Sequence, residues 1–170
     1  MYLDEVCFTK TTLPTLCWSA VRQPLMVDRK QYAQGYYSVI AAISYGRGLE
    51  LIQIEKGSID RAKFKIFLED LRRLHWADDV ALFLDNLSVH RSAEIKESLE
   101  ELGMPAIFNA PYSCEYNPIE HVFAVVKHFF KKERLRCIQM GEKENVKKAI
   151  RTSFAKVNMS EIRNMILRCN

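Results

Sequence analysis

No Cys-x-x-Cys pair occurs among the five cysteines of this 170-residue chain, and no cysteine is spaced with a histidine as in a zinc module. The odd number and wide scatter of these cysteines argue against a disulfide framework. Free thiols are the better interpretation, as in proteins of a reducing compartment. The sequence therefore does not describe a small module stabilised by disulfides or zinc.

Long hydrophobic runs are also missing. No apolar stretch approaches the roughly 20 residues of a membrane-spanning helix, and the N-terminus lacks the basic-then-apolar pattern of a signal peptide. The chain has no internal repeat, low-complexity segment or obvious linker. We therefore expect an intracellular protein without membrane contact, nuclear if the source is eukaryotic, and a single domain over residues 1–170.

Acidic residues are scarce in the last third of the chain. Residues 118–170 carry 12 lysines and arginines against 5 acidic residues, whereas residues 1–117 carry 13 against 16. Such a basic region is typical of proteins with an anionic partner, most commonly nucleic acid. Solvated helix faces would produce the same imbalance, so charge alone leaves both interpretations open.

Five segments have the composition of strands, and one of them, the continuous apolar run 80–84, is typical of a sheet centre. A hairpin is expected where Gly46-Arg-Gly48 separates two of them. The predicted strands are 2–8, 36–45, 49–55, 80–84 and 105–108.

Helical periodicity predicts five helices. The first begins at Ser58 as N-cap, and the second is closed by Gly103. The predicted helices are 58–74, 92–102, 118 to about 132, 142–157 and 160–168.

This succession of elements is that of an α/β protein with a ribonuclease H-like fold, a mixed five-stranded sheet with helices on both faces. The main rival, a flavodoxin-like fold, needs a helix between the early strands, where residues 36–55 offer a hairpin instead.

Asp85 follows the apolar run Val80-Ala-Leu-Phe-Leu84 directly and precedes Asn86. It is therefore expected at the carboxyl end of a buried strand, the edge where open α/β sheets bind ligands. An aspartate that merely caps the turn after a strand would give the same pattern.

Glu120 lies 34 intervening residues further along, in the first turn of a predicted helix. Asn117, Pro118 and Glu120 form a capping-box pattern. Glu120 lies off the helix's apolar stripe, however, so it can cap the helix and also reach a neighbouring strand end.

Asp4 lies inside the first predicted strand, where aspartate is depleted and costly to bury without a partner. Glu5 points to the opposite face because strand side chains alternate, and the pattern alone does not choose between the two. Three converging carboxylates suit Mg²⁺ or Mn²⁺. Two such ions, roughly 4 Å apart, can activate an attacking water and stabilise the leaving oxygen of a phosphodiester.

Two longer motifs make this pattern specific: Asp85-Asn-Leu-Ser-Val-His90, and Ala110-Pro-Tyr-Ser-Cys-Glu-Tyr-Asn-Pro-Ile-Glu120. Together with Tyr2-Leu-Asp4-Glu5 and the spacing of 34, they resemble the catalytic domain of DDE transposases of the mariner-like superfamily. The resemblance covers essentially the whole chain and favours Asp4 over Glu5. Cys114 stands where the family usually has proline, and Asn109-Ala110 replaces a more apolar pair, but neither departure removes a ligand.

The resemblance implies that Asp4, Asp85 and Glu120 are the catalytic residues and bind two Mg²⁺ or Mn²⁺ ions. It also implies a set of residues that shape the site or position Glu120: Asn86, His90, Tyr112, Ser113 and Asn117. With the triad in place, contact with DNA phosphates becomes the better interpretation of the basic cluster. The predicted nucleic-acid-binding residues are Lys127, Lys131, Lys132, Arg134, Lys147 and Lys148.

The function so implied is that of a transposase catalytic domain, which cleaves DNA at transposon ends and transfers the strand to target DNA, with a homodimer as one assembly. Family members normally carry N-terminal helix-turn-helix modules, for which we expect no room here. Two alternatives stay open. One is an inactive or domesticated remnant that binds DNA. The other is an unrelated ribonuclease H-like nuclease, with Asp28 or Asp60 as a fourth carboxylate.

Overall fold

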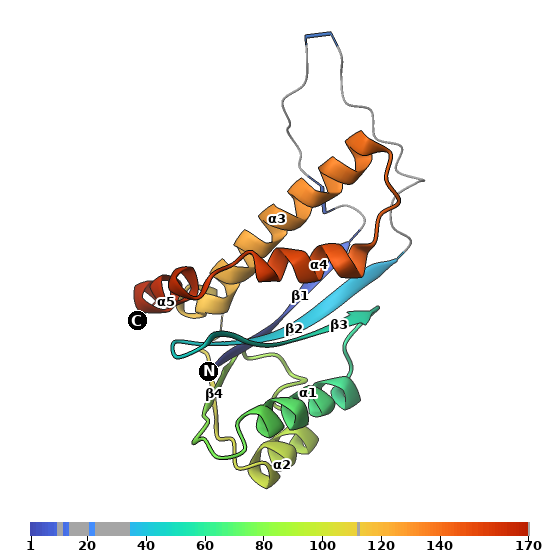
Figure 1. The fold of residues 1–170 in the computed structure, drawn as a ribbon. Helices are drawn as coiled ribbons and strands as arrows, with labels where there is room; N and C mark the ends of the chain where they lie inside the picture. The colour runs from blue at the N-terminus through green and yellow to red at the C-terminus, as the bar shows by residue number, and fades with distance from the viewer. Residues whose placement is uncertain (10–11, 14–20, 23–34, 112, 170) are drawn as a thin grey trace.

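The computed structural model describes residues 1–9, 12–13, 21–22, 35–111 and 113–169. Tyr112 and Asp28 lie outside these residues. The strands are β1 (Tyr2–Thr9), β2 (Tyr36–Ser44), β3 (Gly48–Lys56), β4 (Leu82–Leu84) and β5 (Ala106–Phe108). The helices are α1 (Arg61–Leu74), α2 (Ala93–Glu101), α3 (Pro118–Met140), α4 (Val146–Ala155) and α5 (Met159–Arg168), with a 3₁₀ turn η1 (Cys114–Tyr116) before α3 (Figure 1).

The five strands form one mixed sheet in the order β3-β2-β1-β4-β5. β1, β2 and β3 pair antiparallel, whereas β4 is parallel to both β1 and β5. The central strand β1 therefore joins the hairpin to the parallel half of the sheet. Its register pairs Leu3 with Leu84, so that Asp4 and Asp85 are the next residues along two neighbouring strands.

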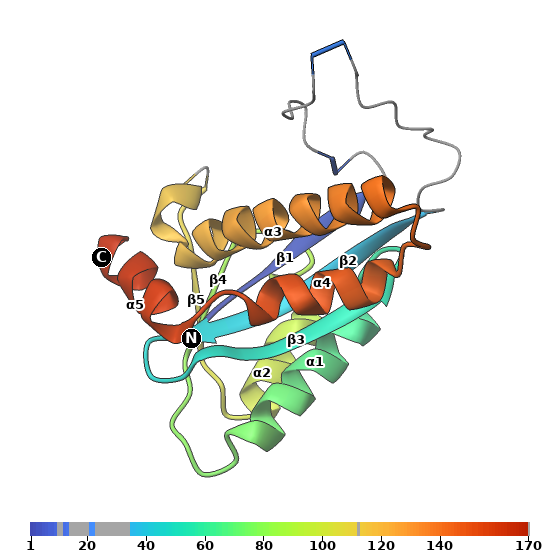
Figure 2. The ribbon, with the colours of Figure 1, turned by 45° about the horizontal axis from the view of Figure 1, so that its top comes forward.

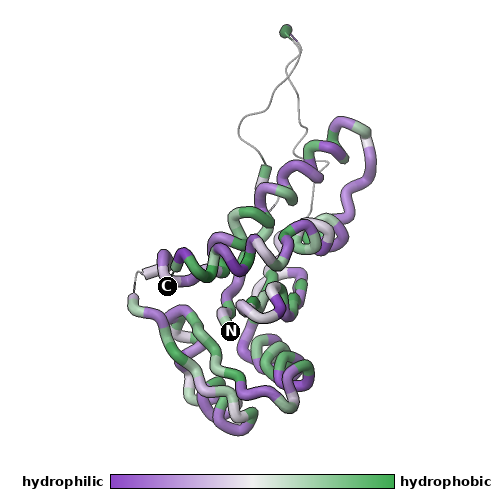
Figure 3. Tube along the Cα trace, turned by 60° about the vertical axis from the view of Figure 1, so that its left-hand side comes forward, coloured by the Kyte–Doolittle hydropathy of each residue, from purple (hydrophilic) through white to green (hydrophobic). Residues whose placement is uncertain are grey.

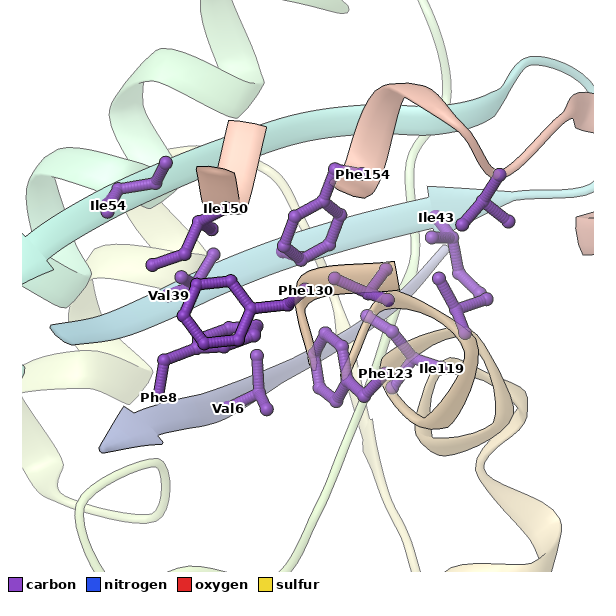
Figure 4. Packing of buried hydrophobic residues seen from close by; sticks show 14 of the residues in the cluster. Val6, Phe8, Val39, Ile43, Ile54, Ile119, Phe123, Phe130, Ile150 and Phe154 are labelled. Atoms are coloured by element: carbon purple, nitrogen blue, oxygen red, sulfur yellow. The ribbon is translucent and has the colours of Figure 1, made fainter. Parts of the chain in front are cut away.

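Helices cover both faces of the sheet, with α1 and α2 on one side and α3, α4 and α5 on the other (Figures 1 and 2). Alternation along β1 divides its side chains between two cores. Val6 and Phe8 pack with residues of α3, α4 and α5, including Phe123, Phe130 and Phe154 (Figure 4). Leu3 packs with α1 and α2 on the opposite face. The ribonuclease H-like fold class is confirmed.

The helices alternate between polar and apolar residues along their length, as expected of elements with one buried stripe (Figure 3). None of the described helices is long and apolar enough to cross a membrane. Within the described part of the chain, Cys7, Cys137 and Cys169 are free thiols, as predicted.

Some predicted boundaries were wrong. Asp60 and not Ser58 caps α1, because its side chain accepts a hydrogen bond from Lys63 N at 2.9 Å. Helix α3 continues to Met140, since buried residues persist at helical spacing through Phe130, Arg134 and Cys137. It ends where Gly141 adopts a φ of 64°, which moves the start of α4 to Val146.

Two glycines offer a matched test of how α5 packs on the hairpin. Gly48 and Gly57 both have positive φ, 79° and 93°, so alanine at either position should cost about 1–2 kcal/mol. A Cβ at Gly48 would also lie 3.2 Å from Met159 Cα, whereas nothing lies within 4 Å of a Cβ at Gly57. We expect Gly48→Ala to lower the free energy of unfolding in urea clearly more than Gly57→Ala. Equal losses would contradict the contact between α5 and the hairpin.

Candidate active site

Asp4, Asp85 and Glu120 line a single cavity of about 390 Å³ where β4 ends. They come from β1, from the residue after β4 and from the first turn of α3, so the sheet register and the start of α3 bring them together. The other lining residues are Asn86, Leu87, Asn109, Ala110, Pro111, Ser113 and Asn117. Asp60 is not among them, because it caps α1.

Asp4 is the most buried of the three acids, with 6% of its surface exposed. Its Oδ1 accepts a hydrogen bond from Glu5 N at 2.7 Å, and its Oδ2 accepts one from Asn117 Nδ2 at 3.0 Å. Burial, together with the negative charges of Asp85 and Glu120, raises the pKa of Asp4 to about 7, although the hydrogen bond from Glu5 N acts in the opposite direction. A cation bound nearby would stabilise the ionised form of Asp4 and so lower its pKa.

Asp85 is held by His90. His90 Nδ1 lies 2.6 Å from Asp85 Oδ1, and Nε2 lies 3.3 Å from Glu5 Oε1. The ring is fully buried and stacks on Phe64 with ring centroids 4.6 Å apart. Burial alone lowers the pKa of His90, but hydrogen bonds to Asp85 and Glu5 outweigh it and raise the pKa to about 9. His90 is therefore a cation at neutral pH that contacts the carboxylates of Asp85 and Glu5.

Asn117 does not form the predicted capping box with Glu120, since α3 has no side-chain cap hydrogen bond. The Asn117 side chain is turned toward Asp4, to which its Nδ2 donates. The residue is 2% exposed, and its Oδ1 accepts no hydrogen bond from the described residues. Glu120 is exposed at the rim of the cavity. The asparagine thus serves the acidic cluster and not the helix end.

The loop before α3 is held by Asn109, which the sequence pattern had marked only as a departure from the family. Asn109 Nδ2 donates to Ser113 O at 2.6 Å, and Oδ1 accepts from Ala110 N at 2.8 Å. A polar residue directly after an apolar strand was the available signal for Asn109.

The predicted site residues Ser113 and Asn86 both line the cavity, and Asn86 Oδ1 accepts from Arg91 at 3.1 Å.

The donor set suits a hard divalent cation. As the side chains stand, no three histidines, cysteines or acids of the described residues are close enough to form a complete coordination set. Three carboxylates nevertheless face one cavity, and the raised pKa of Asp4 and the unpaired Asn117 Oδ1 mark a site that lacks positive charge on the cavity side. Oxygen donors of this kind are those that Mg²⁺ and Mn²⁺ prefer.

Five of the six predicted DNA-contacting residues are accessible. Lys127 and Lys131 are half-buried, and Lys132, Lys147 and Lys148 are exposed. They lie on α3 and α4, which run side by side over the sheet (Figure 2).

The sixth, Arg134, was predicted wrongly. Its side chain is 1% exposed, and Nε pairs with Glu144 at 2.5 Å. A terminal nitrogen also donates to the carbonyl oxygens of Thr9 and Thr12 at 3.4 and 3.3 Å. Arg134 therefore anchors the end of β1 to α3, and it has no free face for a phosphate. Its position on the buried stripe of α3, four residues after Phe130, was the signal for burial.

The family model described as DDE superfamily endonuclease matches residues 1–140. The chain belongs to this family. No curated protein matched the sequence. Among solved structures, the fold is similar to the Mos1 mariner paired end complex with Mn, with 18% identity and a TM-score of 0.71 over 99% of this chain and 51% of that chain.

Two further structures share the fold. The catalytic domain of Mos1 mariner transposase has 16% identity and a TM-score of 0.66 over 99% of this chain and 75% of that one. The simian T-cell lymphotropic virus intasome in complex with PP2A regulatory subunit B56 gamma has 12% identity and a TM-score of 0.64 over 92% and 47%. This DDE chain spans about half the length of the Mos1 chain in the paired end complex.

The pKa of Asp4 predicts how stability depends on pH when metal is removed by a chelator. Because the pKa of about 7 in the folded protein exceeds the ordinary 3.8, the folded state holds the proton more tightly. The contribution of Asp4 to the free energy of unfolding is thus largest at low pH and is lost as the pH rises through 7. Asp4→Asn stays neutral, so its stability relative to wild type should rise between pH 5 and pH 8.

The size of this change is on the order of a few kcal/mol, at about 1.4 kcal/mol per pKa unit. Chemical denaturation at the two pH values measures it. Asp70→Asn, which removes an exposed partner of Arg73, is the control and should show no such change. A stability difference for Asp4→Asn that is constant with pH would contradict the assigned pKa.

Proposed function

We propose that this chain is the catalytic domain of a transposase, which cleaves DNA phosphodiesters at transposon ends with the help of two Mg²⁺ or Mn²⁺ ions and transfers the strand to target DNA. The observation that carries the proposal is the meeting of Asp4, Asp85 and Glu120 in one cavity of a DDE-family chain. The fold is shared with Mos1 structures that include a paired end complex with Mn and a strand transfer complex.

Asp4, Asp85 and Glu120 would hold the metal. When bound, divalent ions would supply an activated nucleophile and stabilise charge on the leaving oxygen. Asn117 fixes one oxygen of Asp4, and His90 fixes one oxygen of Asp85, so the carboxylates are oriented before any ligand arrives. Asn109 holds the loop that forms one wall of the cavity. The protein thereby contributes position and charge and needs no nucleophilic side chain.

DNA as the partner is supported by the accessible lysines of α3 and α4. These would contact the phosphate backbone without reading the sequence, so recognition of transposon ends would depend on another part of the protein or on a partner. A homodimer is part of this proposal, with one copy for each transposon end, because the similar Mos1 structures include a paired end complex.

The catalytic assignment predicts loss of cleavage on neutralising any one acid. With Mn²⁺ and a supercoiled plasmid or a labelled duplex, Asp4→Asn, Asp85→Asn and Glu120→Gln should each reduce cleavage by at least about 10²-fold, the scale of losing one central electrostatic contribution. Asp79→Asn, an exposed acid before β4, is the matched control and should cleave as wild type does. Metal-dependent cleavage that persists in Asp85→Asn would contradict the assignment of Asp85 as a metal-binding catalytic residue.

A chain without cleavage and without Mn²⁺ binding, but with salt-sensitive DNA binding, would instead identify an inactive remnant.

The lysine assignment predicts a change in how DNA binding depends on salt. Each phosphate contact that is removed should reduce the magnitude of the slope of log K against log salt by about 1. We therefore expect Lys131→Ala combined with Lys148→Ala to make this negative slope shallower by about 2. Fluorescence anisotropy with a DNA duplex at several salt concentrations measures it. Lys63→Ala on α1, on the opposite face of the sheet, is the control. An unchanged slope would remove these lysines from the DNA surface.

A further inference from the structure

Glu5 points away from Asp4, yet it reaches the acidic cavity through His90. We infer that Glu5 is a positioning residue of the active site, which holds the His90 ring in the orientation that presents Asp85 to the metal. The inference rests on the proposed function in so far as the ligand of Asp85 is a metal. The contacts that join Glu5, His90 and Asp85 do not depend on that function. Glu5, unlike Asp4, does not line the cavity.

The His90 ring has its two nitrogens committed to two carboxylates from different strands. Nδ1 contacts Asp85 after β4, and Nε2 contacts Glu5 in β1. A ring with no exposed surface has no water to satisfy a free nitrogen, so the loss of either partner would leave a buried polar atom unpaired. Asp85 can satisfy only one nitrogen, and Glu5 is the described residue that satisfies the other.

The consequence falls on Asp85. Its side chain accepts hydrogen bonds from His90 and from Leu87 N, the latter at 3.3 Å, and both end on Oδ1. Oδ2 accepts none from the described residues and stays available for a ligand. The ring plane is set by stacking on Phe64, and its rotation within that plane is set by Glu5. Removing Glu5 would free the ring to turn, and the hydrogen bond from Leu87 N at 3.3 Å would be the remaining contact that fixes Oδ1 of Asp85.

A purely packing role for His90 would make Glu5 dispensable. The side chain of Glu5 is 25% exposed, so shortening it should leave the core intact. Partners that orient metal-binding side chains without touching the metal typically change metal affinity by 10- to 100-fold. Glu5 acts through one more residue, so we expect the lower end of that range.

The test compares Glu5→Ala and Glu5→Gln with wild type by titration calorimetry with Mn²⁺. Glu5→Ala should weaken Mn²⁺ binding by on the order of tenfold. Glu5→Gln keeps an acceptor for His90 Nε2 and should restore binding to within about twofold. Glu55→Ala is the control and should bind as wild type does, because Glu55 lies on β3 and its side chain accepts a hydrogen bond from Gln53, outside the cavity. Mn²⁺ binding in Glu5→Ala equal to wild type would overturn the inference.

A second readout separates this inference from the proposed function. In metal-free protein, the nitrogen-15 NMR spectrum of the His90 ring should show a protected Nε2–H in wild type and Glu5→Gln, and its loss in Glu5→Ala. An unchanged His90 signal in Glu5→Ala overturns the inference even if metal binds. Absence of Mn²⁺ binding in wild type, with the expected NMR change, refutes the metal function and supports the Glu5–His90 contact.

Discussion

A carboxylate in the middle of the central strand is the constraint on which the rest of this structure depends. Asp4 lies between β2 and β4, almost fully buried, where an unpaired charge is costly. The surroundings reduce that cost only in part, through Asn117 and the Glu5 amide, and two more acids stand nearby. Such an arrangement lowers the free energy of unfolding but gathers negative charge in one place, as functional sites commonly do.

The fold supports this cluster from both faces of the sheet. On one face, α3 starts with Asn117 against Asp4 and then buries its apolar stripe on β1. On the other face, His90 is wedged between Phe64 and the ends of β1 and β4. The acids therefore come from three elements, and Asp4 and the half-buried Asp85 are each fixed by a partner from a different layer. Packing between the layers and the positioning of the acids therefore depend on the same few side chains.

The sequence predicted what is local and periodic. The hairpin at Gly46-Arg-Gly48, the alternation of β1 and the end of β4 at Asp85 all follow from short patterns, and they lead to the sheet order. Glu120 was recognised through its motif. Asn117, His90 and Arg134 also contact residues far away in the sequence, with separations of 113 residues to Asp4, 85 to Glu5 and 125 to Thr9, and no local pattern reveals these contacts. Asn117 was therefore mistaken for a cap, and Arg134 for a surface cation.

Joint binding of a divalent metal by Asp4, Asp85 and Glu120 can be observed in a crystal structure of the protein with Mn²⁺, by anomalous scattering at the manganese edge. We expect an anomalous peak in the cavity within coordination distance of both Asp4 and Asp85, with Glu120 at the same site. Manganese found only elsewhere on the protein, with the cavity free of anomalous density at saturating Mn²⁺, would contradict it.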